Sequence, residues 1–316
     1  MSDAVAIVTG AGNGLGRSIA VGLSARVRTA VLCDVDHDGL LETEELITRS
    51  SSRTTVVRKH ADVSDRAQVN DLAEHYRREV SGDLAYLVNN AGIVGGSSFF
   101  ADDPDHWDKT FAINWGGTYN VCRAFQPELL SSPAAYIVNV SSANGFWASS
   151  AHNTPLSAYS TSKFAIKGFT EALVVDCKRH APNVKPVLVM LGQLDTRLAF
   201  NSRRYLELPA PADMSDAQIE ALREQLVDPM RSMSVSDLRE ALQNTLTRAR
   251  GEHVVTPDHA AGQILDAIDR GEWRIVIGDG ARLLDEAVRI APQDAYESTF
   301  LQRVVSQRDG ASSNGE

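Results

Sequence analysis

The sequence is poor in cysteine, and the few cysteines it has are badly placed for cysteine-based sites. Only Cys33, Cys122 and Cys177 occur among 316 residues, far apart and without CxxC spacing. An odd number at such distances indicates neither a disulfide framework nor a zinc site. We therefore expect a cytoplasmic chain that binds no metal.

Positive charge and long apolar runs are also scarce. The formal net charge is -10 and the basic residues form no long cluster, which argues against nucleic acid and anionic membranes as partners. No apolar segment is long enough to span a bilayer, and the first strand follows Met1, Ser2 and Asp3 without a basic leader. The expected partner is a small molecule.

What the chain has is an alternation of strand and helix patterns. Short β-branched runs predict seven strands, at residues 5–9, 29–34, 55–60, 84–89, 136–140, 187–190 and 273–277. Helical periodicity lies between them, notably at residues 14–25, 40–49, 64–79, 104–130 and 157–179. Apolar strands separated by helices need cover on both faces, which predicts an α/β fold, a single Rossmann-type doubly wound parallel sheet over residues 1–306. Pro186 is expected at the start of its strand, where a missing N–H is tolerated.

The alternation stops over residues 199–256, where we expect a helical insertion before the last helix–strand unit. The insertion shows two helical patterns and no strands of its own, at residues 213–226 and 236–250. Its methionines suit either an adaptable apolar lid or simple packing, at Met214, Met230 and Met233. Residues 307–316 contain no core-forming side chains and are expected to be disordered.

A glycine-rich loop follows the first predicted strand and opens the first predicted helix. Glycines let the backbone turn tightly and approach a pyrophosphate, which then rests on helix N-terminal N–H groups. The residues concerned are Gly10, Asn13, Gly14, Leu15 and Gly16. Asp34 ends the second strand, at the spacing expected for an acid that accepts a ribose 2'-hydroxyl. Because neither Asn13 nor Val35 is basic, the pattern favours NAD over NADP.

Tyr159 and Lys163 lie one helical turn apart. A phenol has a pKa of about 10, and a neighbouring ammonium favours its ionised form, so the pair can move protons near neutral pH. Taken alone, a Tyr and a Lys at this spacing are more often two solvated residues of a helix surface. The motifs around the pair favour the catalytic interpretation.

In these motifs the chain resembles the classical short-chain dehydrogenase/reductase family. Residues 9–16 match its TGxxxGxG loop and residues 89–92 its NNAG motif. The resemblance implies cofactor contacts for Asn89, Ala91 and Gly92, an adenine contact for the Asp62–Val63 pair, and a carboxamide contact for Thr196. It also implies an intact catalytic tetrad of Asn114, Ser142, Tyr159 and Lys163.

In family terms, Tyr159 is the general base in alcohol oxidation and the general acid in ketone reduction. Lys163 lowers the pKa of Tyr159 and holds the nicotinamide ribose, Ser142 donates to the substrate oxygen, and Asn114 positions a water that leads protons to Lys163. The interval between Ser142 and Tyr159 is longer than usual in the family, which leaves Ser149 and Ser150 as alternatives to Ser142. The resemblance also implies a homo-oligomer, a dimer or tetramer.

The substrate is less closely defined. Phe146 and Trp147 follow the catalytic serine and suggest aromatic walls for a bulky, largely apolar, aryl or steroid-like alcohol or ketone, although such residues also pack in cores. We expect an NAD-dependent oxidoreductase acting on a secondary alcohol or a ketone. A non-catalytic NAD sensor or scaffold and an extended-type epimerase or dehydratase are the alternatives.

Overall fold

A seven-stranded parallel sheet forms the centre of the protein. The computed structural model describes residues 3–51, 53–149, 155–223, 229–247 and 254–305. The strands run in the order β3-β2-β1-β4-β5-β6-β7, with bounds β1 (Ala4–Thr9), β2 (Thr29–Asp34), β3 (Thr55–His60), β4 (Asp83–Asn89), β5 (Ala135–Val140), β6 (Val184–Leu191) and β7 (Arg274–Ile277). The predicted doubly wound α/β sheet of seven strands is confirmed.

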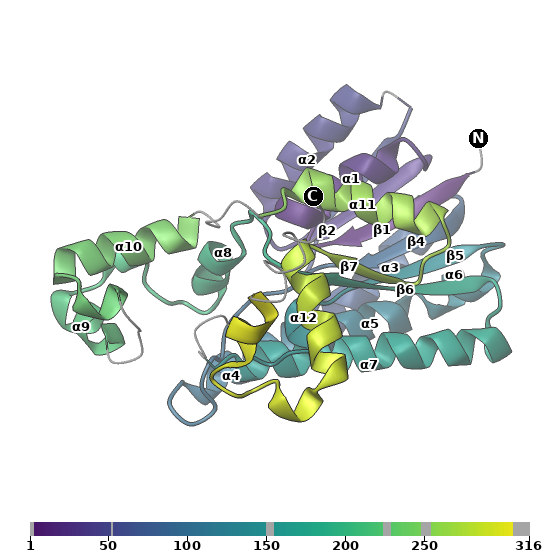
Figure 1. Ribbon diagram of the computed structural model, residues 1–316. Helices are drawn as coiled ribbons and strands as arrows, with labels where there is room; N and C mark the ends of the chain where they lie inside the picture. The colour runs from purple at the N-terminus through teal and green to yellow at the C-terminus, as the bar shows by residue number, and fades with distance from the viewer. Residues whose placement is uncertain (1–2, 52, 150–154, 224–228, 248–253, 306–316) are drawn as a thin grey trace.

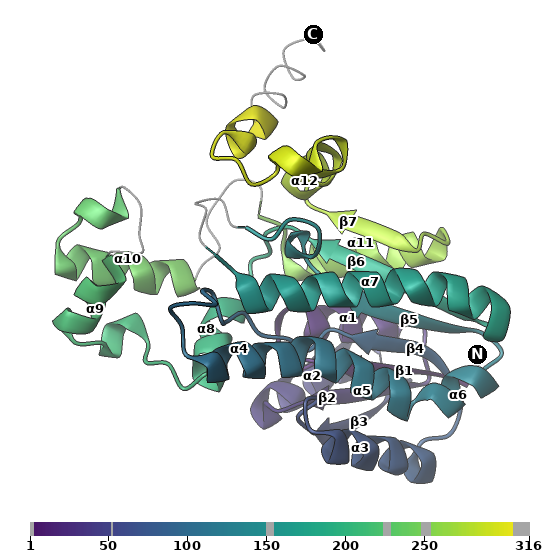
Figure 2. The same ribbon diagram turned by 90° about the horizontal axis from the view of Figure 1, so that it is seen from below.

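Helices cover both faces of this sheet (Figure 1). One face carries α1 (Gly14–Ser24), α2 (His37–Ser50) and α11 (Pro257–Asp269). The other carries α3 (Arg66–Glu79), α5 (Gly117–Ala124), α6 (Gln126–Ser131) and α7 (Ser157–His180), which lie in front of the sheet in Figure 2. Because side chains alternate along a strand, Ala6 and Val8 enter one core cluster while Val5 and Ile7 enter the other.

Two aspartates determine where α2 and α3 begin. The sequence periodicity predicted these starts a few residues away from their observed positions. Asp36 accepts a hydrogen bond from the Gly39 N–H, so α2 begins at His37 rather than at residue 40. Asp65 accepts from the N–H groups of Ala67 and Gln68, so α3 begins at Arg66 rather than at residue 64. Each carboxylate satisfies first-turn donors that have no partner within the helix.

The range of helical periodicity predicted at residues 104–130 is helical, but it consists of four consecutive elements rather than one regular helix. These are α4 (Pro104–Phe111), the π-helix η1 (Ala112–Gly116), α5 and α6. The break between α5 and α6 comes at Phe125, and Pro127 then lacks the N–H that would continue the helical hydrogen bonds. The π-helix contains Asn114, and such wide turns are frequent at functional sites.

Pro186 lies inside β6 and not at its start, because the strand begins earlier, at Val184. The N–H of Leu188 donates to Trp273 on the β7 side of the sheet. Pro186, two residues earlier, faces the same side, where β7 has not yet begun. Its missing N–H therefore removes no bond from the sheet.

The insertion forms helices that extend beyond the carboxyl end of the sheet (Figure 1). They are α8 (Leu198–Tyr205), α9 (Asp216–Arg223) and α10 (Val235–Thr247), with α10 packed on both of the others. Residues 224–228 and 248–253, and the tail predicted to be disordered at 307–316, lie outside the described residues. None of the helices in the described ranges is long and apolar enough to cross a membrane.

The C-terminal part packs on the segment that follows β5. Phe146 and Trp147 are buried in a cluster with residues of α12 (Asp279–Ile290) and the chain after it, among them Phe300. The Trp147 indole N–H donates to the Ala295 carbonyl at 2.7 Å. Both aromatics therefore belong to the core, which was the alternative interpretation of their position.

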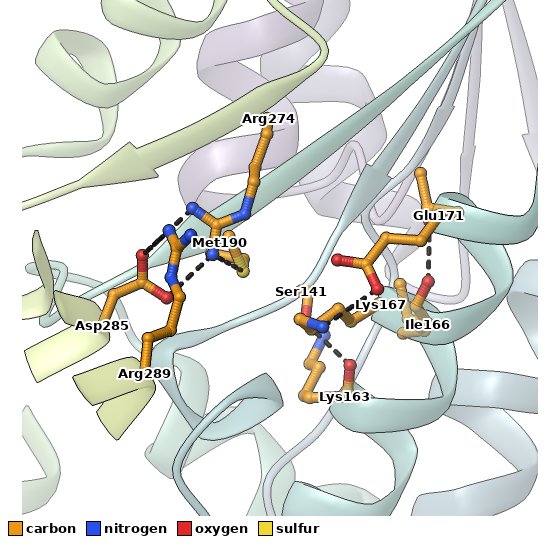
Figure 3. Close-up of polar contacts among 10 residues, drawn as sticks. Ser141, Lys163, Ile166, Lys167, Glu171, Met190, Arg274, Asp285 and Arg289 are labelled. Atoms are coloured by element: carbon orange, nitrogen blue, oxygen red, sulfur yellow. Dashed lines mark hydrogen bonds and ion pairs between the residues drawn. The ribbon is translucent and has the colours of Figure 1, made fainter. Parts of the chain in front are cut away.

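A buried carboxylate ties α12 to the last strand. Asp285, 4% exposed, accepts hydrogen bonds from Arg274 at 2.8 and 3.0 Å and from Arg289 at 2.6 Å (Figure 3). Burial alone would raise the pKa of this carboxyl, but the two guanidinium groups outweigh it and lower the pKa. The cluster thus links helix and sheet edge electrostatically.

We predict that Asp285→Asn lowers the free energy of unfolding by about 2–3 kcal/mol, because it leaves the partly buried Arg274 guanidinium without a counter-charge. Chemical denaturation measures the effect. Glu286→Gln, the exposed neighbour on α12, is the matched control and should stay within about 0.5 kcal/mol of the unmodified protein. Equal losses in the two variants would contradict the role given to Asp285.

Candidate active site

A cavity lies where the carboxyl ends of β1, β2, β4, β5 and β6 meet. This is the edge at which open α/β sheets bind ligands, where the strand order changes direction between β1 and β4. Twelve residues predicted from the sequence line the cavity: Gly10, Asn13, Gly14, Leu15, Asp34, Asp62, Val63, Ala91, Gly92, Tyr159, Lys163 and Thr196. The fold thus brings together residues from the whole first two-thirds of the chain.

The glycine loop is held tightly against the end of β4. The Asn90 side-chain amide donates to the carbonyls of Thr9 at 3.0 Å and Gly10 at 3.2 Å. Gly10 has a φ of 65°, and a Cβ on it would lie 2.9 Å from the Ala91 Cα. Any larger residue would be strained and would push the two loops apart.

Two further features of this loop suit an anion. A Cβ on Gly16 would overlap the Gly10 carbonyl, so this glycine lets α1 start directly beneath the loop. Asn13 makes no side-chain cap bond, and α1 has no acidic residue in its first turn. The first N–H groups of α1 therefore keep their partial positive charge for a phosphate.

Asp34 closes the other side of the loop. Its carboxylate accepts hydrogen bonds from the backbone N–H groups of Gly12 at 2.8 Å and Asp36 at 3.0 Å. Burial raises the pKa of this carboxyl, and the two hydrogen bonds counteract the rise. The position at the end of β2, facing the cavity, is the one expected of an acid that binds ribose hydroxyls.

Asp62 has a local structural role besides its place in the cavity wall. Its Oδ1 accepts from the Ser64 N–H at 2.8 Å and from the Ser64 hydroxyl at 2.7 Å, so it shapes the turn before α3. The same residue and Val63 line the cavity. A local structural role therefore coexists with the predicted place in the adenine end.

Lys163 is deeply buried on α7 and tied to β5 by reciprocal hydrogen bonds. Its ammonium donates to the Val140 carbonyl at 3.0 Å, while the Ser141 hydroxyl donates to the Lys163 carbonyl at 2.9 Å (Figure 3). Burial lowers the pKa of Lys163 from 10.5 to about 8. A group with this pKa exchanges protons in the physiological pH range.

Tyr159 lies one turn earlier, with the Lys163 ammonium 5.6 Å from the centre of its ring. Burial raises the pKa of its phenol and Ser142 lowers it in part, so the net lowering expected from Lys163 is not found. The Ser142 oxygen itself accepts from the Asn144 N–H at 3.1 Å. Because that N–H fixes one side of the Ser142 oxygen, the serine O–H is free to donate toward Tyr159.

The serine predicted as catalytic, Ser142, is thus the one that lowers the pKa of the Tyr159 phenol. Of the two alternatives, Ser149 accepts a hydrogen bond at its backbone carbonyl from the Asn144 side chain, at 2.7 Å. Ser150 lies outside the described residues. Ser142 does not itself line the cavity; Ser141, its neighbour, does. Ser142 meets the site through its contact with the phenol.

Asn114 is completely buried behind the cavity. Its amide pairs with both backbone groups of Ile93, at 2.8 and 2.9 Å, and donates to the Ser162 hydroxyl at 2.9 Å. Asn114 therefore supports the segment after β4. This segment faces Lys163, because a Cβ on Gly92 would lie 2.9 Å from the Asn114 side chain and 3.6 Å from the Lys163 nitrogen. Its water relay stays a prediction.

Asn89 is placed away from the cavity wall. Its amide donates to Asn139 at 2.8 Å and to the Cys122 sulfur at 3.2 Å, and Asn139 donates in turn to Thr170 at 2.9 Å. This network joins β4, β5 and α7 inside the core. The neighbouring Asn90, not predicted, faces the cavity instead; its place in the same NNAG motif was the available signal.

Other lining residues carried no motif that sequence reasoning had used. Five of them come from the end of β6, the segment after it and α8: Leu191, Leu194, Leu198, Asn201 and Tyr205. The three methionines offered as lid residues do not line this cavity.

Comparisons with known proteins agree with this geometry. Residues 4–206 match the family model described as short chain dehydrogenase. The oxidoreductase SadH of Mycobacterium tuberculosis is 30% identical over 290 residues, covering 90% of each chain. Mouse epidermal retinol dehydrogenase 2 is 33% identical over 172 residues, 54% of each chain. A short-chain dehydrogenase/reductase from Burkholderia phymatum, solved in complex with NAD, superposes with a TM-score of 0.70 at 24% identity, over 92% of this chain and 95% of that one.

We predict that Lys163→Met stabilises the fold at neutral pH. The folded state disfavours the charged ammonium, so Lys163 costs up to about 3 kcal/mol at pH 7, and this cost disappears as pH rises from about 8 to 10.5. Denaturation at a series of pH values should show a stability gain for the variant at pH 7 that vanishes at high pH.

Lys167→Met is the matched control, because Lys167 lies one turn further along α7 and pairs with Glu171 at 3.0 Å near the surface (Figure 3). It should give no gain of this kind. A difference between Lys163→Met and the unmodified protein that stays constant with pH would refute the burial argument.

Proposed function

The chain belongs to the short-chain dehydrogenase family, and on that premise we propose that it is an NAD-dependent oxidoreductase that interconverts a secondary alcohol and a ketone. The observation that carries the proposal is the placement of Tyr159 and the buried Lys163, one helical turn apart on α7, on the wall of the cavity that the glycine loop also lines. These are the groups a hydride transfer needs beside the substrate oxygen.

The cavity suits a dinucleotide along its whole length. The glycine loop and the start of α1 would hold the pyrophosphate, Asp34 the adenosine ribose, and Thr196 the carboxamide. A Cβ on Gly14 would lie 3.5 Å from the Thr196 side chain, so the segment after β6 already reaches over the loop. When bound, NAD would accept or supply the hydride.

Within the protein, the proton would travel through side chains of α7. In alcohol oxidation the Tyr159 oxygen takes the hydroxyl proton, and in ketone reduction it returns one to the developing alkoxide. The Ser142 O–H would stabilise negative charge on the phenol or substrate oxygen. The Lys163 ammonium, 5.6 Å from the ring centre, would favour the phenolate against the burial that raises the pKa of the phenol. Asn114 would support a water path by which Lys163 exchanges protons with solvent.

We also propose that the substrate is bulky and largely apolar. The support comes from the cavity wall and from a relative, and no longer from Phe146 and Trp147, which are buried in the core. The cavity that Tyr159 lines has several apolar side chains in its wall, among them Ile93, Ile113, Leu191 and Leu194. The mouse relative is a retinol dehydrogenase by name, and retinol is a long apolar alcohol. Both observations favour an apolar substrate, aryl or steroid-like, over a sugar.

We predict that Tyr159→Phe lowers kcat by about a thousandfold or more while the dissociation constant for NAD changes less than threefold. The substitution removes only the proton donor and keeps the ring. Turnover is measured by formation of reduced nicotinamide over a panel of secondary alcohols and ketones, and cofactor binding by calorimetry.

Tyr119→Phe, on α5 outside the cavity, serves as the control and should keep full activity. Tight NAD binding by the unmodified protein without turnover on any substrate would favour the sensor or scaffold instead. Turnover of nucleotide sugars alone would favour the epimerase or dehydratase.

Cofactor choice gives a second test. Asp34 would repel a 2'-phosphate, so the dissociation constant for NADP should exceed that for NAD by at least about tenfold. Asp34→Asn should make the two dissociation constants more nearly equal. Direct titration with both cofactors measures it. Tighter binding of NADP to the unmodified protein would show that Asp34 does not select the cofactor.

A further inference from the structure

The insertion helix α8 presents one face to the cofactor cavity. Leu198, Asn201 and Tyr205 line the cavity, and their spacing of three and then four residues places them on one side of a helix. The insertion therefore contributes to the cavity and does not merely pack beside it.

Two contacts fix α8 against the end of β4. The Ser202 hydroxyl accepts a hydrogen bond from the Val94 N–H at 2.8 Å and donates to the Leu198 carbonyl at 2.6 Å. Leu206, 3% exposed, packs so closely on Gly95 that a Cβ there would clash with it. Tyr205 lies between these two anchors, so its backbone is held in place from both sides.

Tyr205 shares the cavity with the two acids that mark its proposed adenosine end. Asp34 and Asp62 both line this cavity, and their carboxylates, together with that of Asp36, raise the pKa of the Tyr205 phenol. Burial first, and these charges next, raise the pKa of Tyr205 to about 12. The hydroxyl therefore keeps its proton and is a hydrogen-bond donor at all ordinary pH values.

The backbone already supplies Asp34 with two hydrogen bonds, from Gly12 and Asp36. Neither involves Tyr205, a residue that is 37% exposed. A partly exposed ring beside a ribose-binding carboxylate offers a flat apolar surface for a nucleoside.

We propose that Tyr205 is a cofactor-binding residue supplied by the insertion, which packs its ring against the adenosine of the dinucleotide beside Asp34. This inference rests on the proposed function, since it takes a nicotinamide dinucleotide as the ligand. It gives α8 a binding role at the end of the cavity opposite Tyr159 and Lys163, where it adds affinity without touching the reacting atoms.

The test is direct binding by calorimetry with three probes: NAD, ADP-ribose, which has the adenosine but no nicotinamide, and nicotinamide mononucleotide, which lacks the adenosine. Tyr205→Ala should raise the dissociation constants of NAD and ADP-ribose by the same factor, about tenfold or more. The dissociation constant of nicotinamide mononucleotide should stay unchanged. Tyr205→Phe, which keeps the ring, should stay within about threefold of the unmodified protein for all three. Tyr119→Ala is the control, and thermal melting checks that each variant is folded.

The outcomes separate this inference from the function it rests on. If the unmodified protein binds neither NAD nor ADP-ribose, the proposed function fails and this inference with it. If it binds both, and folded Tyr205→Ala binds them equally well, only the role of Tyr205 is overturned. If Tyr205→Ala weakens the binding of nicotinamide mononucleotide as much as that of NAD, the role of Tyr205 is also overturned, because the substitution would then have displaced α8 as a whole.

Discussion

The site depends on the attachment of α7 to the end of β5. Lys163 donates to the Val140 carbonyl and Ser141 donates to the Lys163 carbonyl, so helix and strand each satisfy a buried polar group of the other. A Cβ on Gly145 would lie 2.9 Å from the Lys163 carbonyl, so only glycine lets the following loop pass this point. The attachment fixes the position of Tyr159 on α7. It also holds the Lys163 ammonium at a buried position that disfavours its charge, which lowers stability in the way typical of functional sites.

The rest of the cavity follows from the order of the strands. Because β1 and β4 are neighbours, the glycine loop meets the segment after β4, and Asn90 joins them. Asp34 at the end of β2 and Asp62 just after β3 then lie on one side, and the proton-transferring groups after β5 lie on the other. A ligand that reaches both must be long, with a sugar near the acids and its reacting atom near Tyr159, which is the shape of a dinucleotide.

Local signals predicted most of the fold and the site, and long-range packing decided the remainder. All seven strands and the cavity-facing glycine loop follow from short patterns, because parallel strands are apolar throughout and glycines mark required turns. The π-helix at Asn114 follows no such pattern, since its contacts are to Ile93 and Ser162, far away in the sequence. Phe146 and Trp147 were equally compatible with a substrate wall, and only the C-terminal cluster that covers them settles their place.

The proton step assigned to Tyr159 is tested most directly by the pH dependence of kcat/KM for alcohol oxidation, compared between the unmodified protein and Ser142→Ala. The Ser142 hydrogen bond lowers the pKa of Tyr159, so its loss should move the midpoint of the rising limb to higher pH. Residual activity in the variant should therefore recover in alkaline solution. A midpoint that stays at the same pH in both proteins would contradict the assignment, because the ionising base would then not be the phenol that Ser142 contacts.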